Sequence, residues 1–251
     1  MRPPEGRPSA FSGNRLTRGK NGNDSEGREA GMAKEEIPPL SLAGTLFRED
    51  PALRVFRHPP EMETPRLRLR KLRMRDAEKL FSWMSDPEVA RYVLWRAHRT
   101  RGETRSYLRY IRSQYRRGFP CSWGLEIRET GELIGTMGVM AWYPDHGCME
   151  VGYSLGQLWW HHGYAAEALE CLMDLLFEEG NLNRIEAQCD VRNPNSARVM
   201  EKCGMRREGL LRQRIFNKGE PVDVMLYAAL AQDRKKEKTG RMPFFQTGEE
   251  R

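Results

Sequence analysis

The sequence predicts an α/β (α+β) fold in which helices cover both faces of a mixed, mostly antiparallel central sheet of about seven strands. Three observations predict this fold. Between Glu150 and Leu169 the chain changes from alternating β-formers to apolar residues at helical spacing. Short glycine-containing turns at 129–131 and 217–220 each join two strand-like segments. Helical patterns stand before and after these segments, as in a sheet protein with helical layers.

The elements of this fold follow in order along the chain. Leu67 and Leu69 alternate in a first strand, and Asp76 begins a helix that ends before Asp86-Pro87. The later elements are an arginine-rich helix over 103–117, strands over 122–128, 132–143, 149–155, 184–191, 205–217 and 222–230, and helices over 163–180 and 193–204.

Length and composition are those of one domain with tails. The 251 residues are enough to bury a core. We expect a disordered N-terminal extension over 1–61, which is rich in Gly, Pro, Arg, Ser and Asn, a domain over 62–231, and a charged flexible tail over 232–251. Because the chain has no long apolar run and no signal-peptide pattern, we expect a soluble cytoplasmic protein without a membrane span.

The cysteines and histidines predict neither disulfides nor a metal site. The five cysteines are scattered and contain no Cys-x-x-Cys pair, which favours reduced thiols that lie mostly in the core. The only adjacent histidines, His161 and His162, do not have the spacing of two ligands on one helix face.

The net charge of +7 is concentrated in residues 62–117, which hold sixteen Lys and Arg against six Asp and Glu. Four arginines of the predicted helix recur at three- and four-residue steps, while Leu108, Ile111 and Tyr115 mark another face. These arginines are Arg105, Arg109, Arg112 and Arg116. The arginine face is either a solvated helix surface or a docking site for an acidic partner, such as an acidic peptide or the RNA of a ribosome.

The change of period at Gly163 predicts an anion-binding loop. The start of a helix leaves backbone N–H groups without partners and carries a partial positive charge, so a loop that admits a ligand there can bind phosphate. Neither common nucleotide motif occurs here, neither Gly-x-x-x-x-Gly-Lys-Ser/Thr nor Gly-x-Gly-x-x-Gly. The segment is therefore either a site for another phosphate carrier or a strand-loop-helix with glycine in a tight turn.

The loop resembles the acetyl-coenzyme A loop of the Gcn5-related N-acetyltransferases (GNAT), whose pattern is Gln/Arg-x-x-Gly-x-Gly/Ala. This pattern falls on residues 160–165, Trp-His-His-Gly-Tyr-Ala, in which Gly163 and Ala165 fit. Trp160 replaces Gln or Arg, as in the RimJ/RimL-like branch that acetylates ribosomal-protein N-termini, where Trp-Gly-x-Gly-Tyr-Ala is usual. His161 stands in place of a glycine of that branch.

A second motif strengthens the resemblance. The branch carries Asn-x-x-Ser-x-x-Val-x-Glu-Lys-x-Gly-Phe/Met after the loop, and residues 193–205 match it as Asn-Pro-Asn-Ser-Ala-Arg-Val-Met-Glu-Lys-Cys-Gly-Met. The residues that follow Met62, Glu-Thr-Pro-Arg-Leu, also resemble the start of proteins in this branch, so Met62 is an alternative translation start. The resemblance covers about 62–230.

The resemblance implies that the strand before the loop splays away from its neighbour and that acetyl-coenzyme A is the cosubstrate. Pantetheine would lie along the end of that strand, the pyrophosphate would sit on the N–H groups of residues 160–165, and Lys202 or Arg198 could reach the 3′-phosphate. His161 and His162 are either phosphate contacts or solvent-facing. The implied binding residues are Tyr153, Ser154, Leu155, Trp160, His161, His162, Gly163, Tyr164, Ala165, Asn193, Ser196 and Lys202.

Amine acetylation needs a group to remove a proton from the amine and an acid for the departing thiolate. Glu150, on the strand before the loop, is the predicted base, acting through one water; alternatively it is an edge carboxylate in an ion pair. Many family members place a tyrosine acid where Met200 stands, and methionine cannot donate a proton. Ser196 is therefore the predicted acid, unless it only caps its helix.

Together these residues predict an acetyl-coenzyme A-dependent N-acetyltransferase that moves an acetyl group to a primary amine by direct attack in a ternary complex. The predicted acceptor is the α-amino group of a protein or peptide N-terminus. The alternatives are a small-molecule amine, such as an antibiotic or an amino acid, and a non-catalytic protein that binds coenzyme A or an acidic partner. The sequence leaves monomer and homodimer open.

Overall fold

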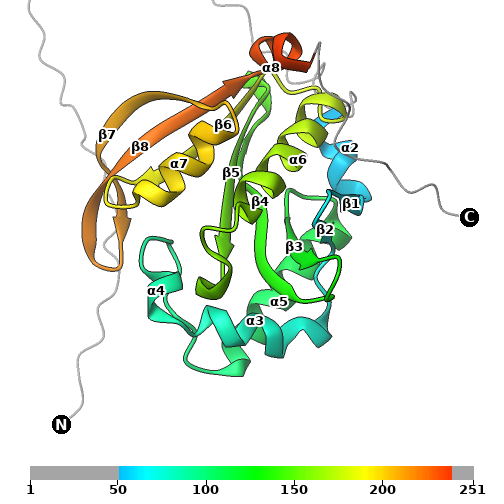
Figure 1. The fold of residues 1–251 in the computed structure, drawn as a ribbon, viewed down its shortest axis with the longest axis vertical. Helices are drawn as coiled ribbons and strands as arrows, with labels where there is room; N and C mark the ends of the chain where they lie inside the picture. The colour runs from blue at the N-terminus through cyan, green and yellow to red at the C-terminus, as the bar shows by residue number, and fades with distance from the viewer. Residues whose placement is uncertain (1–50, 239–251) are drawn as a thin grey trace, which may run out of the picture. The chain divides into compact units, whose positions relative to one another are not determined.

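The structure is a computed structural model that describes residues 51–238. Its sheet has eight strands in the order β1-β2-β3-β4-β5-β6-β8-β7 (Figure 1). All neighbouring strands are antiparallel except β5 and β6, which confirms the predicted mixed sheet. The strands are β1 (Met62–Glu63), β2 (Leu67–Arg70), β3 (Ser122–Ile127), β4 (Leu133–Tyr143), β5 (Cys148–Leu155), β6 (Arg184–Asp190), β7 (Arg206–Asn217) and β8 (Glu220–Leu230). Seven were expected, and the additional one is the two-residue β1.

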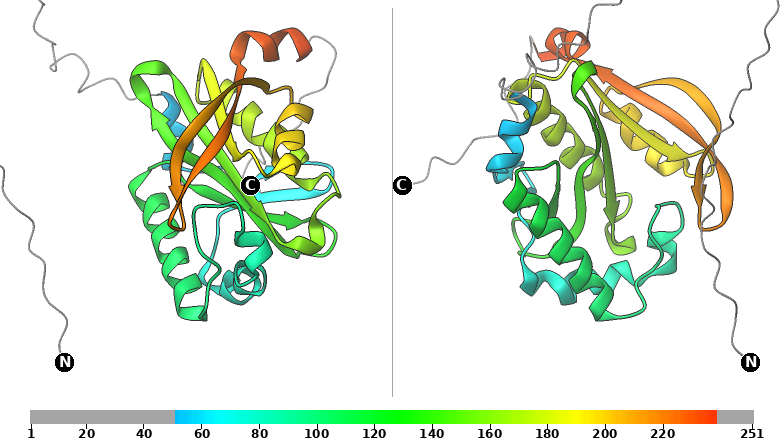
Figure 2. Two further views of the ribbon diagram at one scale, coloured as in Figure 1. Left: turned by 90° about the vertical axis from the view of Figure 1, so that its left-hand side faces the viewer. Right: turned by 180° about the vertical axis from the view of Figure 1, so that it is seen from behind.

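Helices cover both faces of the sheet, as predicted. Figure 1 and the right-hand view of Figure 2 show α6 and α7 on one face and α5 on the other. The helices are α2 (Pro51–Arg57), α3 (Ala77–Met84), α4 (Pro87–Ala90), α5 (Arg101–Arg117), α6 (Tyr164–Glu178), α7 (Pro194–Lys202) and α8 (Ala231–Lys238). Helix α6 buries apolar side chains at the helical spacing that predicted it, and α7 begins at the predicted Asn-Pro signal.

Helix α5 has the two faces that its sequence predicts. The Thr100 side chain caps its start, and Gly118, at φ 64°, ends it in the left-handed conformation that glycine adopts most easily. Leu108 and Ile111 are buried, whereas all four arginines of the arginine face are exposed. Exposure is common to a docking face and a solvated face, so the acidic partner remains a prediction.

The strand β5 pairs with β6 over only three residues, from Cys148 to Glu150. Beyond Glu150 the two strands diverge, and β5 continues to Leu155 with β4 as its neighbour on the other edge. Figure 1 shows the resulting gap, with α6 on one side of it and α7 on the other. The predicted splay is therefore present, and it begins at the residue predicted to act as base.

The predicted N-terminal boundary is wrong, because α2 lies inside the expected disordered extension. Phe56 is 0% exposed, and its ring centroid lies 6.0 Å from that of Trp123. The indole of Trp123 donates a hydrogen bond to the carbonyl oxygen of Pro60 at 2.8 Å. The core thus begins before Met62, which argues against Met62 as the translation start; residues 1–50 lie outside the described part of the chain.

The predicted C-terminal tail also begins too early, because α8 continues to Lys238. Arg234 forms an ion pair of 2.8 Å with Asp174, which is buried on α6. A buried carboxylate needs such a partner, so the start of the expected tail belongs to the domain. Residues 239–251 lie outside the described chain.

All five cysteines are buried free thiols, as the sequence predicts. Burial raises the pKa of Cys148 to about 11 and that of Cys171 to about 12, which keeps these thiols protonated. Within residues 51–238, no helix is long and apolar enough to cross a membrane, and no cluster of metal-ligating side chains occurs.

Replacing Phe56 with alanine tests whether α2 belongs to the core. Phe56→Ala should lower the free energy of unfolding by about 3–5 kcal/mol, because it removes a fully buried aromatic ring. Urea unfolding measures this change. The control is His58→Ala, which alters an exposed side chain and should change stability by less than about 0.5 kcal/mol. Equal effects of the two substitutions would contradict the packing of α2.

Candidate active site

Glu150 lies where β5 and β6 part, and its carboxylate has no ion-pair partner within the described chain. Its Oε2 accepts a hydrogen bond of 3.1 Å from the side-chain amide of Gln188. Burial, and then the charge of Glu186 in the paired position of β6, raise the pKa of Glu150 above its ordinary value. The charge of Arg214 lowers this pKa in part, but the two side chains form no ion pair within the described chain, so the ion-pair alternative gains no support. The group is a half-buried carboxylate with increased proton affinity.

The loop before α6 has the conformation expected of an anion-binding loop. Gly163 occupies the N-cap position at φ 81°, and no side chain caps the helix there. The preceding His161 also has a positive φ, 64°, which explains why the family pattern has glycine at this place. The backbone N–H groups at the start of α6 are therefore available to an anion.

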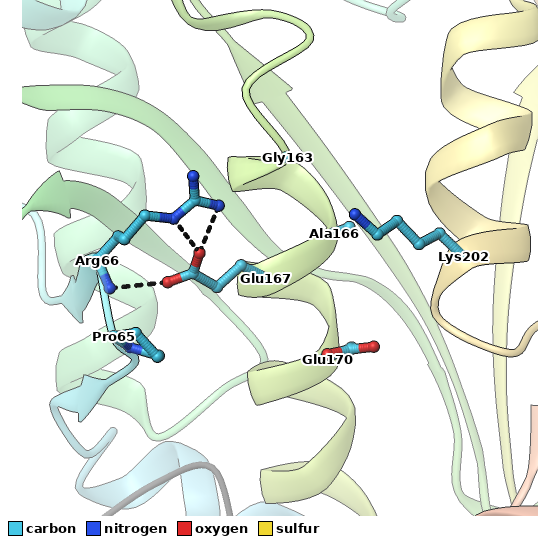
Figure 3. A pocket seen from close by; sticks show the side chains of 7 residues that line it. All are labelled: Pro65, Arg66, Gly163, Ala166, Glu167, Glu170 and Lys202. Atoms are coloured by element: carbon cyan, nitrogen blue, oxygen red, sulfur yellow. Dashed lines mark hydrogen bonds and ion pairs between the residues drawn. The ribbon is translucent and has the colours of Figure 1, made fainter.

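Two cations approach Gly163 from different elements. A Cβ atom at Gly163 would lie 3.4 Å from Nη2 of Arg66 and 3.9 Å from Nζ of Lys202. Figure 3 shows Lys202 extending from α7 toward the start of α6, opposite Arg66. Lys202 and the helix start each contribute positive potential at the loop, while the charge of Arg66 is paired with that of Glu167. The chemistry of these donors fits a phosphate group, and a side chain at 163 would occupy part of the space.

A small pocket of about 220 Å³ opens beside this loop. It is lined by Pro65, Arg66, Gly163, Ala166, Glu167, Glu170 and Lys202 (Figure 3). Lys202, which the resemblance implies as a cosubstrate-binding residue, lies at this pocket. Arg198 lies one turn earlier on α7, where it donates to the Asn195 side chain, and it is not among the lining residues.

The prediction that the N–H group of Trp160 binds pyrophosphate is wrong. This N–H donates to the carbonyl oxygen of Gln157 at 3.1 Å, within the short 3₁₀ helix η3 (Gln157–Trp159). The indole of Trp160 donates to the carbonyl oxygen of Leu155 at 2.8 Å and packs against the core. Trp160 thus ties the loop to the end of β5 instead of facing the ligand.

The side chains of His162 and Tyr164 stabilise the loop from within. Nδ1 of His162 lies 2.7 Å from the carbonyl oxygen of Trp160, and its ring stacks on Tyr164 with centroids 5.9 Å apart. The guanidinium of Arg66 covers the Tyr164 ring at 4.6 Å and donates to the His162 carbonyl oxygen at 2.9 Å. These contacts assign structural roles to the side chains of His162 and Tyr164, and both His161 and His162 are exposed.

Arg66 is a site residue to which the sequence analysis gave no role. Its Nε and Nη2 both lie 2.7 Å from Oε2 of Glu167 in the first turn of α6, and its backbone N–H donates to Oε1 (Figure 3). The only signal in the sequence was its place in the Thr-Pro-Arg stretch that resembles the start of family members. Its partners are about a hundred residues away and could not be inferred.

Beyond Glu150 along β5, Tyr153 contacts Ser196 on α7. Their hydroxyl oxygens lie 2.9 Å apart, and the Tyr153 hydroxyl also lies 3.1 Å from the Ser196 carbonyl oxygen. Burial raises the pKa of Tyr153, so this hydroxyl stays protonated at neutral pH. The side-chain oxygen of Asn193 accepts the Ser196 backbone N–H at 3.2 Å and thus caps α7. The structure therefore brings the expected acid, Ser196, to the end of the splayed strand.

The remaining expected residues lie around the same loop and strand. Ser154 and Leu155 pair with Thr136 and Gly135 of β4, and the Leu155 side chain is buried. Ala165 is half-buried in the first turn of α6. Met200 is 0% exposed, which agrees with a packing role and with the absence of a proton donor at this position.

A sheet that splays before a strand-loop-helix is the arrangement expected of a coenzyme A-dependent acyltransferase. The model of the acetyltransferase (GNAT) domain family matches residues 66–206. The chain belongs to this family and is an N-acetyltransferase, and acetyl-coenzyme A is the acetyl donor of this family.

Known relatives agree with this assignment. The chain is 34% identical over 170 residues to an uncharacterised N-acetyltransferase, p20, of Bacillus licheniformis, covering 68% of this chain and 96% of p20. It is 33% identical over 104 residues to the ribosomal-protein-serine acetyltransferase of Escherichia coli, covering 41% and 58% of the two chains. A crystal structure of a GNAT-family acetyltransferase from Bacillus anthracis superimposes with a TM-score of 0.62 at 28% identity, covering 68% of this chain and 99% of that one.

A valine at Gly163 tests the loop. Gly163→Val should weaken coenzyme A binding about tenfold or more, because the side chain enters the space between the two cations and strains a positive-φ position. Titration calorimetry with coenzyme A measures the Kd. Gly131→Val is the matched control, since Gly131 has φ 69° with open space around it and lies in a distant hairpin. Equal affinities of the two variants would contradict the assignment.

Proposed function

We propose that this enzyme acetylates the α-amino group of a protein or peptide N-terminus. The observation that carries the proposal is Glu150, a carboxylate with a raised pKa and no ion-pair partner within the described chain, at the start of the gap between β5 and β6. The similarity to the ribosomal-protein-serine acetyltransferase supports this acceptor class, although that similarity covers less than half of the chain.

The proposed role of Glu150 is to accept the proton of the amine through one water. An α-amino group titrates near pH 7.7–8.0, about three units below a lysine side chain, and is therefore partly neutral in the cell. A base of modest strength is sufficient for such an acceptor. The Gln188 amide orients the carboxylate, and the neighbouring Glu186 increases its affinity for the proton.

Beyond Glu150 along the gap, the proposed binding residues would hold the acetyl donor. The start of α6, with Arg66 and Lys202, would hold its phosphate groups, and the unpaired edge of Tyr153 to Leu155 would accept its pantetheine arm. Bound acetyl-coenzyme A supplies an activated thioester. The proposed proton donor to the leaving thiolate is the Ser196 hydroxyl. The Tyr153 hydroxyl, which lies within hydrogen-bond distance, would orient it.

The proposal predicts acetyl transfer to peptides with a free N-terminus. Incubation with acetyl-coenzyme A should release free thiol, and mass spectrometry should place the added acetyl group on the α-amine. The panel contains N-terminal peptides of ribosomal proteins, the same peptides with a blocked α-amine and a retained lysine, and small amines including amino acids. Activity confined to the small amines would replace the proposed acceptor with a small-molecule amine.

The pH dependence tests Glu150. If Glu150 and the acceptor amine must both be deprotonated, a plot of log kcat/KM against pH should approach a slope of two at pH values below both pKa values. In Glu150→Gln only the amine titrates, so the slope should be one. The substitution should also lower kcat/KM by about 10²–10⁴-fold.

Glu186→Gln is the matched control for this experiment. The charge of Glu186 raises the pKa of Glu150. Without that charge, the part of the pH profile that reports the ionisation of Glu150 should shift to lower pH, and the variant should remain active. An unchanged slope in Glu150→Gln, with unchanged kcat/KM, would exclude Glu150 as the base.

A further inference from the structure

The gap between β5 and β6 has two walls, which part after Glu150 and meet again at the end away from Glu150. After Glu150 and Glu186, one wall continues along β5 and β4, and the other continues along β6, β8 and β7. The β7–β8 hairpin extends past the end of β6, and all three views place its tip beside the segment that begins with α4 (Figures 1 and 2). That segment belongs to the first wall, because α3 packs against both α4 and β4.

The tip of the hairpin is a tight two-residue turn formed by Lys218 and Gly219. These residues have φ values of 54° and 104°, as in type I′ hairpin turns, and the flanking Asn217 and Glu220 are paired. Such a turn fixes the position of the Lys218 backbone, so its side chain projects from a rigid support.

Lys218 makes the contact across the gap. Its Nζ donates to the carbonyl oxygens of Ala90 at 2.7 Å, Arg91 at 3.3 Å and Val93 at 2.6 Å. An ammonium group has three donors, and here each of them has a carbonyl acceptor at the end of α4 or just beyond it. These carbonyls have no partner within a helix this short, so the ammonium satisfies groups that would otherwise require water.

A weaker contact runs in the opposite direction. Nη2 of Arg96 donates to the carbonyl oxygen of Lys218 at 3.5 Å. Within residues 51–238, the hydrogen bonds that join the hairpin tip to the α4 segment come from these two side chains. The backbone of the two walls and the Lys218 contacts therefore form a closed ring around the place where β5 and β6 part.

We propose that Lys218 is a specificity-determining residue, which closes the far end of the gap and limits the width of the passage by which the acceptor amine reaches Glu150. The inference rests on the proposed function, since it takes the gap as the place of acetyl transfer. A closed ring admits an extended peptide end or another slender primary amine and excludes amines with bulk close to the nitrogen. The residue remains exposed, so the contact is made by one side chain and can be removed without opening the core.

The test compares Lys218→Ala with the wild type on pairs of acceptors that differ only in bulk. The first pair is a glycine-first and a tryptophan-first peptide, and the second is a linear and an α-branched alkylamine. In Lys218→Ala, the ratio of kcat/KM for the bulky acceptor to that for the slender one should increase about tenfold or more, the size of effect that pocket width has on selectivity. The Kd of coenzyme A, measured by calorimetry, should change less than about twofold, because that site lies on other elements.

Two further variants and one further measurement make the result specific. Lys218→Arg retains donors for the same carbonyls and should keep the wild-type ratio. Lys79→Ala removes an exposed lysine of α3 and should also show the wild-type acceptor ratio. Amide hydrogen exchange of residues 90–96 should be faster in Lys218→Ala than in the wild type, which reports the contact without any activity.

The outcomes separate this inference from the proposed function. An active wild type with an unchanged acceptor ratio in Lys218→Ala would overturn the role of Lys218 alone. A wild type that acetylates no amine of either pair or of the wider panel would instead overturn the proposed function. Unchanged hydrogen exchange at 90–96 would show that the contact does not hold the α4 segment in solution, and would also overturn the inference.

Discussion

The loss of pairing between β5 and β6 after Glu150 is the constraint on which the site depends. Strands that stay paired satisfy each other's backbone groups and leave no room for a ligand, whereas strands that part must find other partners for these groups. Here α6 and α7 lie on the two sides of the gap, and the Trp160 indole satisfies the carbonyl of Leu155. The divergence thus produces both an open strand edge, which is the proposed place of the acetyl donor, and a half-buried place for a carboxylate.

The start of α6 combines a site for an anion with an acidic residue in its first turn. Glu167 is favourable to the helix, because a negative charge near the helix start interacts well with the dipole, but it would repel a phosphate bound there. Arg66 resolves this conflict, since it pairs with both Glu167 and the loop carbonyl of His162. Lys202 then adds a second positive charge beside Gly163. The ion pair between Arg66, in the turn from β1 to β2, and Glu167 on α6 therefore stabilises the helix and neutralises a carboxylate beside the loop.

The sequence was sufficient for what depends on local pattern. Period and turn signals predicted seven strands and the main helices within a few residues, and the two motifs located the loop and α7. Local pattern failed for α2, where the short run with Val55 and Phe56 stands in a segment of Gly- and Pro-rich composition. It also could not pair Arg66 with Glu167 or Lys218 with the carbonyl of Ala90, because these contacts join residues 101 and 128 positions apart. Nor could it show that the Trp160 N–H is used within η3.

The departure at His161 shows that the two glycines of the family pattern meet different needs. His161 has a positive φ and an exposed side chain, so the histidine costs only the conformational preference, about 1–2 kcal/mol. The loop can hold it in place because contacts of Trp160, His162 and Arg66 determine the backbone on either side. Gly163 also has a positive φ, and a side chain there would contact Arg66 and Lys202 beside the proposed phosphate site. Conformation alone can be supplied by the surrounding structure, whereas space for the proposed phosphate cannot, so glycine is needed at 163 and not at 161.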